Sequence, residues 1–284
     1  MNPTDQATYA KNTWCPGCGN YSILNALKAV LASLDDEGIP VDNVVLVSGI
    51  GCHAKIVDYL KVNSFYSIHG RTVPVASGIK LANPDLIVIC CSGDGDSLAE
   101  GLDHLIFAAK RNIDLTLILH DNRVYGLTTG QYTPTSPKGF KGKSTPFGSQ
   151  ELPMNPPELM LVSGASYIGR GYTHGIELLK RLFKEAIMHK GFSFVDVLQV
   201  CVTYFNKYES YNKRVYEVKD NDSGSFEEAL RIIRSWNYDD GETPIPLGRF
   251  YQKAASRFDE AFIGRPPVIE DREAKILNVL DDFV

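Results

Sequence analysis

The spacing of apolar residues along the chain predicts helices alternating with buried strands. Apolar side chains recur every three or four positions from Ile23 to Leu34, which is the period of an amphipathic helix over residues 22–34. Four short runs are apolar at nearly every position, which is typical of strands buried on both faces of a parallel sheet. These runs are residues 43–49, 85–93, 114–120 and 192–200. Helical patterns over residues 97–112 and 175–190 lie between them, so we expect an α/β fold with a mostly parallel sheet and helices on both faces.

Two parts of the chain depart from this alternation. Residues 128–157 are rich in Gly, Pro, Ser and Thr and are too long for a simple connection, which predicts a functional loop ordered by a ligand or partner; a plain flexible excursion is the alternative. The pattern weakens after residue 205. We therefore expect an α/β domain over residues 1–205 and a C-terminal extension, residues 206–284, that packs on the core or on a partner. Within the extension, residues 241–252 predict a turn followed by a short helix.

Composition and charge narrow the class of protein. The chain has 284 residues, 44% hydrophobic and 22% charged, and a formal net charge of −5 without a Lys/Arg-rich tract. These values suit a globular protein and give no footprint for nucleic acid or an anionic membrane surface. No apolar run is long enough to span a bilayer, and the polar N-terminus lacks the apolar core of a signal peptide. Six cysteines in such a chain favour metal or redox chemistry in a reducing cytoplasm over a disulfide framework.

Candidate functional residues gather where the predicted strands end. Cys52, Asp94, Asn122 and Cys201 each follow one of the four strands. Ligands of open parallel sheets bind beyond the carboxyl ends of the strands, so we expect these four side chains at one edge of the sheet. Glycines beside Cys52 and Asp94 permit tight turns and a close approach of the backbone to a ligand.

The Gly-Asp-Gly sequence around Asp94 predicts a site for a cation and a phosphate. A carboxylate just past a strand suits a hard cation such as Mg²⁺, and exposed backbone N–H groups suit phosphate. Asn122, one strand–helix–strand unit later, would supply a second side-chain oxygen. Asp and Gly are also ordinary turn residues, so the Gly-Asp-Gly sequence alone is weak evidence. Together with Asn122 it is similar to the signature pattern of thiamine-diphosphate enzymes.

Four cysteines are candidate ligands of a metal centre. Cys15 and Cys18 form a close pair, whereas Cys52 and Cys201 come singly at two strand ends. Four thiolates suit a tetrahedral zinc site or a [4Fe–4S] cluster, and one pair with two distant single cysteines favours the cluster, because structural zinc sites more often use two pairs. Scattered, unrelated thiols are the alternative from spacing alone. The two cysteines inside residues 85–93 are expected to be buried hydrophobic residues.

Several longer segments together resemble the β subunits of 2-oxoacid:ferredoxin oxidoreductases, over about residues 12–205. These segments are WCPGCGN, GIGCHAKI, IHGRTVPVASGIKLANPDL, GDGD and DNRVYGLTTGQYTPTS, and they look most like the two-subunit 2-oxoglutarate enzyme. The resemblance implies a thiamine-diphosphate-binding fold with Mg²⁺ and one [4Fe–4S] cluster. It implies an enzyme that decarboxylates a 2-oxoacid oxidatively with coenzyme A, passes electrons to ferredoxin, and runs in reverse as a reductive carboxylase.

The resemblance also implies a role for individual residues. The cluster ligands would be Cys15, Cys18, Cys52 and Cys201, and the Mg²⁺ ligands would be Asp94, Asn122 and the carbonyl of Val124. The positions that would touch thiamine diphosphate are Ile50, Gly51, Cys52, His53, Arg71, Gly95, Asp96, Gly126 and Leu127. Lys55 would hold the substrate carboxylate, with Leu127 at the same pocket. By residue type alone, Lys55 and Arg71 could equally be solvated surface side chains.

One group that thiamine chemistry needs has no convincing candidate in the sequence. This group is the glutamate that activates the aminopyrimidine ring of thiamine diphosphate. The resemblance implies that this glutamate lies on an α subunit. We therefore expect this chain alone to be inactive. The competing functions are a non-redox thiamine enzyme, which needs no four-cysteine site, and a zinc-stabilised scaffold, which needs neither Asp94 nor Asn122. Within the family, pyruvate or a broad range of 2-oxoacids is the alternative to 2-oxoglutarate.

Overall fold

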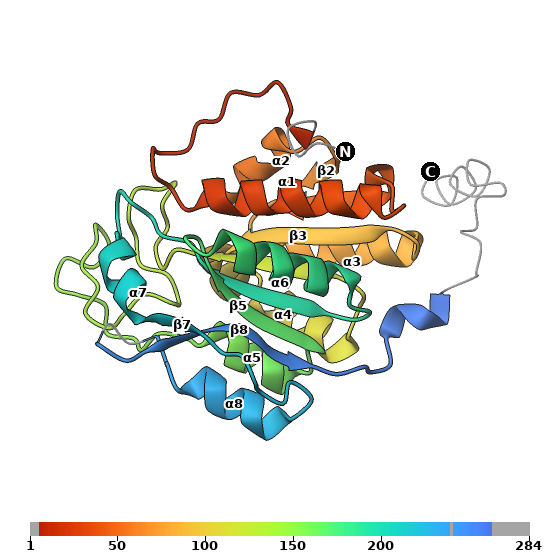
Figure 1. The fold of residues 1–284 in the computed structure, drawn as a ribbon. Helices are drawn as coiled ribbons and strands as arrows, with labels where there is room; N and C mark the ends of the chain where they lie inside the picture. The colour runs from red at the N-terminus through yellow and green to blue at the C-terminus, as the bar shows by residue number, and fades with distance from the viewer. Residues whose placement is uncertain (1–5, 239–240, 263–284) are drawn as a thin grey trace, which may run out of the picture.

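The fold is built on one eight-stranded sheet. The computed structural model describes residues 6–238 and 241–262, and the strands run in the order β2-β1-β3-β4-β6-β5-β8-β7 across the sheet (Figure 1). The strands are β1 Val44–Ser48, β2 Asn63–Tyr66, β3 Ile87–Gly93, β4 Thr116–Asp121, β5 Tyr167–Tyr172, β6 Ser193–Leu198, β7 Val215–Glu217 and β8 Ile245–Gln252. All neighbouring strands are parallel except β5 and β8, which are antiparallel. The predicted α/β class and the four predicted strands, now β1, β3, β4 and β6, are confirmed.

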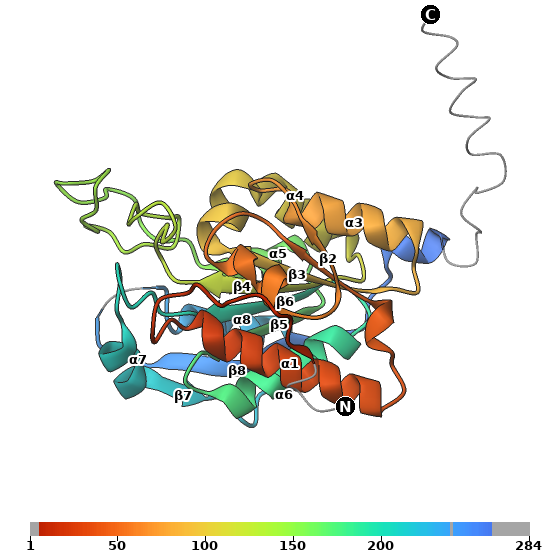
Figure 2. The same cartoon turned by 90° about the horizontal axis from the view of Figure 1, so that it is seen from above.

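Helices cover both faces of this sheet. They are α1 Asn20–Asp36, α2 Ile56–Tyr59, α3 Thr72–Ala82, α4 Leu102–Arg111, α5 Pro156–Ser163, α6 Ile176–Met188, α7 Tyr208–Arg214 and α8 Phe226–Arg234. Figure 2 shows α1 and α6 on one side of the sheet and α3 and α4 on the other. Each side has its own apolar core, and β3 supplies both, with Cys91 in the first and Cys90 in the second. This two-sided burial explains why the central strands are apolar at nearly every position.

The register of the parallel strands brings their carboxyl ends to one edge. Ser48 of β1 pairs with Cys91 of β3, Gly93 of β3 pairs with His120 of β4, and Asp121 of β4 pairs with Leu198 of β6. The residues that follow these strands therefore start from neighbouring points on the same edge.

Two of the expected helices differ from the observed elements. The helix expected over residues 97–112 is interrupted at Gly101. A short π-helical turn, Asp96–Glu100, precedes this glycine, and α4 follows it. A side chain at Gly101 would collide with the backbone of Gly70. The helix expected within residues 241–252 is wrong, because Ile245–Gln252 is strand β8. The two prolines and two glycines of this segment suggested a turn, but β8 pairs antiparallel with β5 and buries Ile245 and Phe250.

The loop between β4 and α5 leaves the same edge of the sheet as the strand ends. Figure 2 shows it extending beyond the helices as a long yellow-green trace. Short antiparallel bridges pair Tyr125 with Gln131 and Gly142 with Thr145 inside the loop. Asn155 ends it by capping α5, since its side chain accepts a hydrogen bond from the Glu158 N–H.

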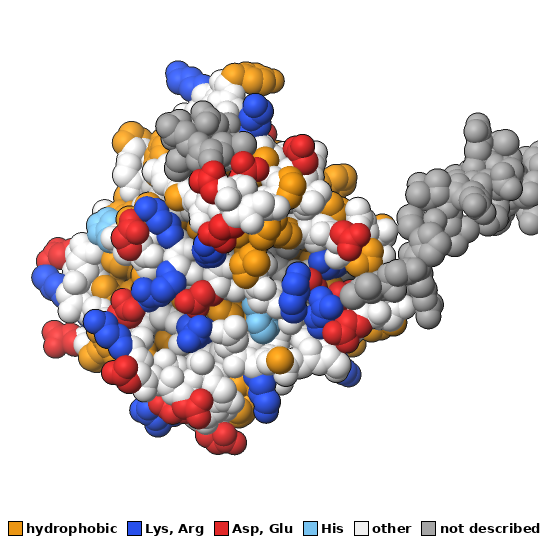
Figure 3. All heavy atoms as spheres, turned by 45° about the vertical axis from the view of Figure 1, so that its right-hand side comes forward, with side chains coloured by type: hydrophobic (Ala, Val, Ile, Leu, Met, Phe, Trp, Pro, Cys, Tyr) orange, Lys and Arg blue, Asp and Glu red, His pale blue; other side chains and the backbone are white. Residues whose placement is uncertain are grey.

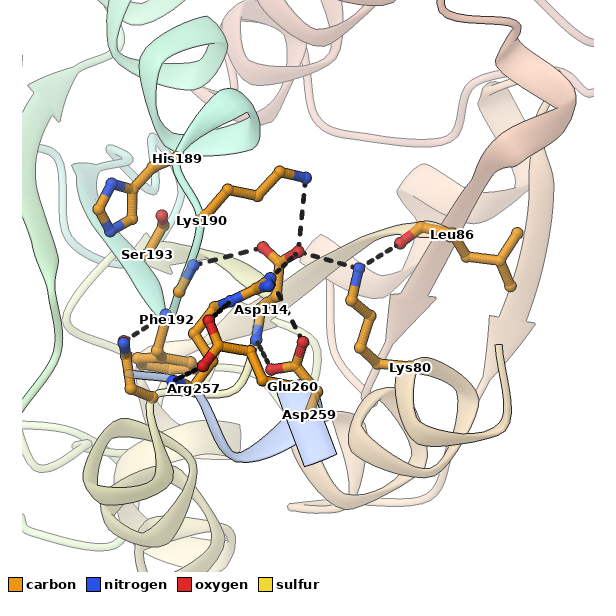
Figure 4. Close-up of polar contacts among 12 residues, drawn as sticks. Lys80, Leu86, Asp114, His189, Lys190, Phe192, Ser193, Arg257, Asp259 and Glu260 are labelled. Carbon is orange, nitrogen blue, oxygen red and sulfur yellow. Dashed lines mark hydrogen bonds and ion pairs between the residues drawn. The ribbon is translucent and has the colours of Figure 1, made fainter. Parts of the chain in front are cut away.

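The C-terminal part of the described chain folds onto the same core. Residues 206–238 and 241–262 contribute α7, β7, α8 and β8, and residues 263–284 lie outside the described residues. Figure 4 shows ion pairs that hold the end of this segment at the amino edge of β4. The Asp114 carboxylate contacts Lys80 Nζ at 3.0 Å and an Arg257 guanidinium nitrogen at 3.1 Å. The division of the chain at residue 205 stays a prediction.

One face of the molecule is mixed in charge. Figure 3 shows acidic and basic side chains interspersed over the visible face. Across residues 6–238 and 241–262, no helix has the length and apolar character needed to cross a membrane.

A buried ion pair ties β5 and β6 to the C-terminal segment. Arg170 Nε donates to Asp196 Oδ2 at 2.8 Å, both side chains are fully buried, and the Tyr238 hydroxyl donates to the same oxygen. The Arg170 guanidinium also lies 5.0 Å from the ring centroid of Trp236. Burial raises the pKa of Asp196, and the charge of Arg170 opposes that effect.

We expect Arg170→Leu to lower the free energy of unfolding by about 3–5 kcal/mol, because it leaves the Asp196 carboxylate buried without its counter-charge. The matched control is Arg181→Leu, which removes a half-exposed arginine paired with Glu217 and should change that free energy by about 1 kcal/mol or less. Urea-denaturation curves of both variants test this difference. Equal stability losses would show that the buried pair has no special role.

Candidate active site

A cavity opens at the carboxyl edge, between the loops that follow β1, β3 and β4. Most of the predicted cofactor and Mg²⁺ residues line it: Ile50, Gly51, Cys52, His53, Asp94, Gly95, Asp96, Asn122, Val124, Gly126 and Leu127. His69, Tyr125 and Thr128 also line this first cavity and were not predicted. Parallel pairing of the strands therefore brings together residues from four separate loops.

Asp96 joins three of these loops. It is 3% exposed, and its carboxylate accepts hydrogen bonds from the Gly70 N–H at 2.9 Å and from the Ser92 hydroxyl at 2.6 Å. Longer contacts reach the Ile50 N–H and the Thr72 hydroxyl. A buried carboxylate with several donors fixes the positions of the groups that supply them. Asp96 therefore holds the wall of the cavity.

Gly49 leaves room for this carboxylate. A Cβ atom at Gly49 would collide with the carboxylate of Asp96, so any larger residue would force the two loops apart. The imidazole of His53 fills the space beside them and is buried. Its Nε2 lies 3.7 Å from Asp96 Oδ2, beyond hydrogen-bond distance, and burial lowers the pKa of His53 to about 4. His53 is thus a neutral ring in the cavity at pH 7.

Asp94 lies at the base of the cavity among hydroxyl groups. Its side chain accepts hydrogen bonds from the hydroxyls of Thr133 and Thr135, and burial raises its pKa to about 6. The Thr135 hydroxyl is also 2.9 Å from Asp121 Oδ1, which links the ends of β3 and β4. Both threonines come from the long loop. The sequence marked that loop as functional, but spacing could not place its hydroxyls beside Asp94.

Asn122 and Val124 line the same cavity as Asp94 and flank an arginine with left-handed backbone geometry. Asn122 Oδ1 accepts a hydrogen bond from the Val124 N–H at 3.0 Å. Arg123 has φ of 60°. Its buried guanidinium donates to the carbonyl oxygens of Thr135 and Tyr238. These bonds anchor a conformation that side chains other than glycine and asparagine rarely adopt.

A second cavity, of about 180 Å³, lies beside the first. All four predicted cluster cysteines line it: Cys15, Cys18, Cys52 and Cys201. The remaining two cysteines, Cys90 and Cys91, are fully buried in the two cores, as expected. Within residues 6–238 and 241–262, no three Cys, His, Asp or Glu side chains stand close enough together to hold a single metal ion. The four thiols surround a space instead of converging on one point.

Gly126 lies between the two single cysteines. A Cβ atom placed on it would be 3.5 Å from the sulfur of Cys52 and 3.8 Å from that of Cys201. The two sulfurs therefore both lie near the side of Gly126 on which a side chain would stand, and Gly126 lines both cavities. Burial raises the pKa of the Cys18 thiol to about 12, and burial raises the pKa of Cys52 while the charge of Lys55 lowers it.

The predicted substrate residues lie at the second cavity, whereas Arg71 lines neither cavity. Lys55 is half-buried there and donates to the Thr13 hydroxyl at 3.0 Å. Leu127 is 48% exposed and lines both cavities. The exposed Arg71 precedes α3, and its guanidinium donates to the carbonyl of Glu100 at 3.2 Å.

Comparisons with known proteins agree with this geometry. Residues 49–197 match the family model described as thiamine pyrophosphate enzyme, C-terminal TPP binding domain. The chain is 40% identical to a 2-oxoacid:ferredoxin oxidoreductase subunit beta of Sulfolobus sp, over 96% of this chain and 95% of that one. It belongs to the family of 2-oxoacid:ferredoxin oxidoreductase β subunits.

Two further relatives carry 2-oxoglutarate in their names. The 2-oxoglutarate synthase subunit KorB of Methanothermobacter thermautotrophicus is 35% identical, over 94% of this chain and 91% of that protein. The solved structure of 2-oxoglutarate:ferredoxin oxidoreductase from Magnetococcus marinus, with 2-oxoglutarate, coenzyme A and succinyl-CoA bound, matches with a TM-score of 0.87. That match has 31% identity and covers 98% of this β subunit and 96% of the solved chain. The predicted family, the enzyme class and the thiamine-diphosphate-binding fold are confirmed.

We expect Gly49→Ala to weaken thiamine diphosphate binding by this β subunit about tenfold or more, because the added methyl group displaces Asp96 and overpacking typically costs about 1–3 kcal/mol. The control is Gly78→Ala in α3, where a Cβ atom has no neighbour within 4 Å, and its affinity should equal that of the parent. Calorimetric titration with thiamine diphosphate and Mg²⁺ measures both. Unchanged affinity in Gly49→Ala would contradict the role of Asp96.

Proposed function

We propose that the first cavity binds thiamine diphosphate with Mg²⁺ and that the second binds a [4Fe–4S] cluster. In this proposal the subunit acts with an α subunit in the oxidative decarboxylation of 2-oxoglutarate to an acyl-coenzyme A, CO₂ and reduced ferredoxin, a reaction that also runs as reductive carboxylation. The observation that carries the proposal is the shared wall of the two cavities. Cys52, Asn122, Gly126 and Leu127 line both. Electrons released in one cavity need to travel only across this wall.

The donor atoms of the first cavity suit Mg²⁺ and a diphosphate. The carboxylate of Asp94, the side-chain oxygen of Asn122 and the carbonyl of Val124 are all oxygen ligands, which a hard cation prefers. Mg²⁺ favours octahedral coordination and keeps phosphate oxygens or water in its remaining positions. In this proposal Arg71 reaches the diphosphate by releasing the carbonyl of Glu100, since its guanidinium is bound there now.

The second cavity suits a cluster better than a zinc ion. Zinc requires four sulfur atoms about 2.3 Å from one point, whereas a [4Fe–4S] cluster has one iron atom for each of four separated thiolates. The four cysteines around a space of about 180 Å³ correspond to the second arrangement. Because burial raises the pKa of Cys18 to about 12, its thiolate needs the compensating charge of bound iron.

The side chains of this subunit would position the substrate. Thiamine diphosphate, when bound, supplies the nucleophile for the 2-keto carbon and the electron sink for decarboxylation. Lys55 would hold a substrate carboxylate as a positive charge beside the cysteines. Leu127, exposed between the two cavities, would pack against the substrate chain. Because the imidazole of His53 is neutral, the negative charge of the diphosphate would be balanced by Mg²⁺ and Arg71 and not by His53.

Two features support a site completed by a partner subunit. The first cavity encloses about 70 Å³, well below the ~300 Å³ of pockets that surround a ligand of drug size, so part of thiamine diphosphate would extend beyond this chain. Among the residues that the structure describes, no glutamate lines this cavity. We propose that an α subunit closes the open side and supplies the activating glutamate. Residues 206–284 would form a C-terminal extension that packs on the core or on the partner subunit. The six unpaired cysteines favour the cytoplasm.

The test of the function is anaerobic co-expression of this chain with a candidate α subunit. We expect reduction of ferredoxin that depends on both 2-oxoglutarate and coenzyme A, with pyruvate a poorer substrate, and no turnover by this chain alone. Names of relatives support 2-oxoglutarate, whereas the Sulfolobus relative is named only for 2-oxoacids. Turnover with pyruvate alone would change the substrate and keep the family. Turnover without an α subunit would refute the shared active site.

A second experiment tests the cluster ligands in the same complex. Cys201→Ala should lose most of the bound iron and the visible absorbance of the cluster, because one of four thiolates is removed. Cys91→Ala is the matched control, since Cys91 is buried in an apolar core and should leave the iron content unchanged. Iron analysis and absorbance spectra measure both variants. Equal iron in Cys201→Ala and in the parent would exclude Cys201 as a ligand.

A further inference from the structure

Gln199 lies between the two proposed centres and touches a ligand of each. It directly follows β6, is 1% exposed, and lines the second cavity. Its Oε1 accepts a hydrogen bond from Asn122 Nδ2 at 3.0 Å, and its Nε2 lies 3.5 Å from the sulfur of Cys18. We propose that Gln199 is a positioning residue that couples the two centres, orienting a Mg²⁺ ligand and tuning the reduction potential of the cluster. This inference rests on the proposed function.

Backbone groups fix the orientation of both amides. The Val124 N–H is a donor, so the Asn122 atom beside it is the oxygen, and the Asn122 nitrogen must face Gln199. The Gln199 atom that meets this nitrogen is therefore Oε1. The carbonyl of Val200, 2.9 Å away, independently requires Nε2 on the other side. One N–H of Nε2 is used by Val200, which leaves the second for Cys18.

The main chain of Gln199 is also fixed. Its N–H donates to the carbonyl of Asp121 at 2.9 Å, which extends the pairing of β4 and β6 by one residue. The next carbonyl, that of Val200, accepts from the Gly19 N–H at 3.3 Å and so holds the loop that carries Cys18. The side chain thus spans two loops whose positions the sheet sets. A buried amide with every polar group used is rigid and cannot turn away from the sulfur without losing its other bonds.

Each bond has a separate chemical consequence. A hydrogen bond from an amide to a cluster thiolate favours the reduced cluster, which carries one more negative charge, and raises its potential. The bond to Asn122 keeps the Asn122 oxygen toward the loop of Val124, where Mg²⁺ would bind. Outer-shell partners of this kind alter metal affinity about 10–100-fold when they are removed. One side chain therefore acts on both electron acceptor and cofactor site.

The test uses Gln199→Met in the anaerobic αβ complex, because methionine keeps the length of the side chain and removes its hydrogen bonds to Asn122, Cys18 and Val200. At the midpoint potential of the parent, the ratio of reduced to oxidised cluster should fall about fivefold, the change that an ordinary hydrogen bond gives. The Mg²⁺ concentration for half-maximal thiamine diphosphate binding should rise about tenfold. Redox titration followed by electron paramagnetic resonance and calorimetry measure the two quantities. Gln252→Met, on β8, is the matched control and should change neither.

The possible outcomes distinguish a failure of this inference from a failure of the proposed function. Movement of both quantities supports the proposal, whereas movement of only one, or of neither, overturns the coupling. If Gln199→Met fails to assemble, Gln199→Glu decides, because it keeps the acceptor for Asn122 and removes the donor to Cys18, together with the donor to Val200. A lower potential with Mg²⁺ dependence near that of the parent supports the proposal, and an unchanged potential overturns it. A parent complex without a reducible cluster refutes the proposed function itself, and this inference with it.

Discussion

Parallel pairing of β1, β3, β4 and β6 is the constraint on which both cavities depend. The register aligns Ser48 with Cys91, Gly93 with His120 and Asp121 with Leu198, so the chain leaves each strand at the same edge. Candidate cofactor and cluster residues that follow these strands, although far apart in the sequence, become neighbours for this reason. Helices on both faces bury the strands, and the free edge is where polar residues are tolerated.

Buried polar groups then set the detailed shape of that edge. Asp96 joins three loops through backbone N–H groups and hydroxyls, and Gly49 leaves space for its carboxylate. Arg123 is anchored to the long loop through the Thr135 carbonyl, and Thr135 in turn binds Asp94. Each such group is costly to bury unless its hydrogen bonds are made, so the loops have one favoured arrangement. Contacts within this chain therefore hold these loops in place.

The sequence predicted the elements whose hydrophobic period is simple and the residues that follow them. The four central strands, the first helix and α6 were predicted correctly. Strands buried on both faces are apolar at nearly every position, and helices buried on one face have apolar residues every three or four positions. Strand β8 was missed because its proline and glycine imitate a turn, and only pairing with β5 makes it a strand. Thr133, Thr135 and Gln199 were missed because their importance comes from contacts across the fold, which no local spacing records. The roles of all the predicted site residues stay predictions, and Arg71 differs from the others because it lines neither cavity.

The central claim is that an iron–sulfur cluster and a thiamine cofactor occupy adjoining cavities with Cys52, Asn122, Gly126 and Leu127 between them. Anomalous X-ray diffraction at the iron edge, from anaerobic crystals of the αβ complex with thiamine diphosphate and Mg²⁺, tests it most directly. The account predicts one compact iron peak enclosed by the four cysteines, with cofactor density across the shared wall. A zinc peak there, or iron at any other place in this subunit, would contradict it.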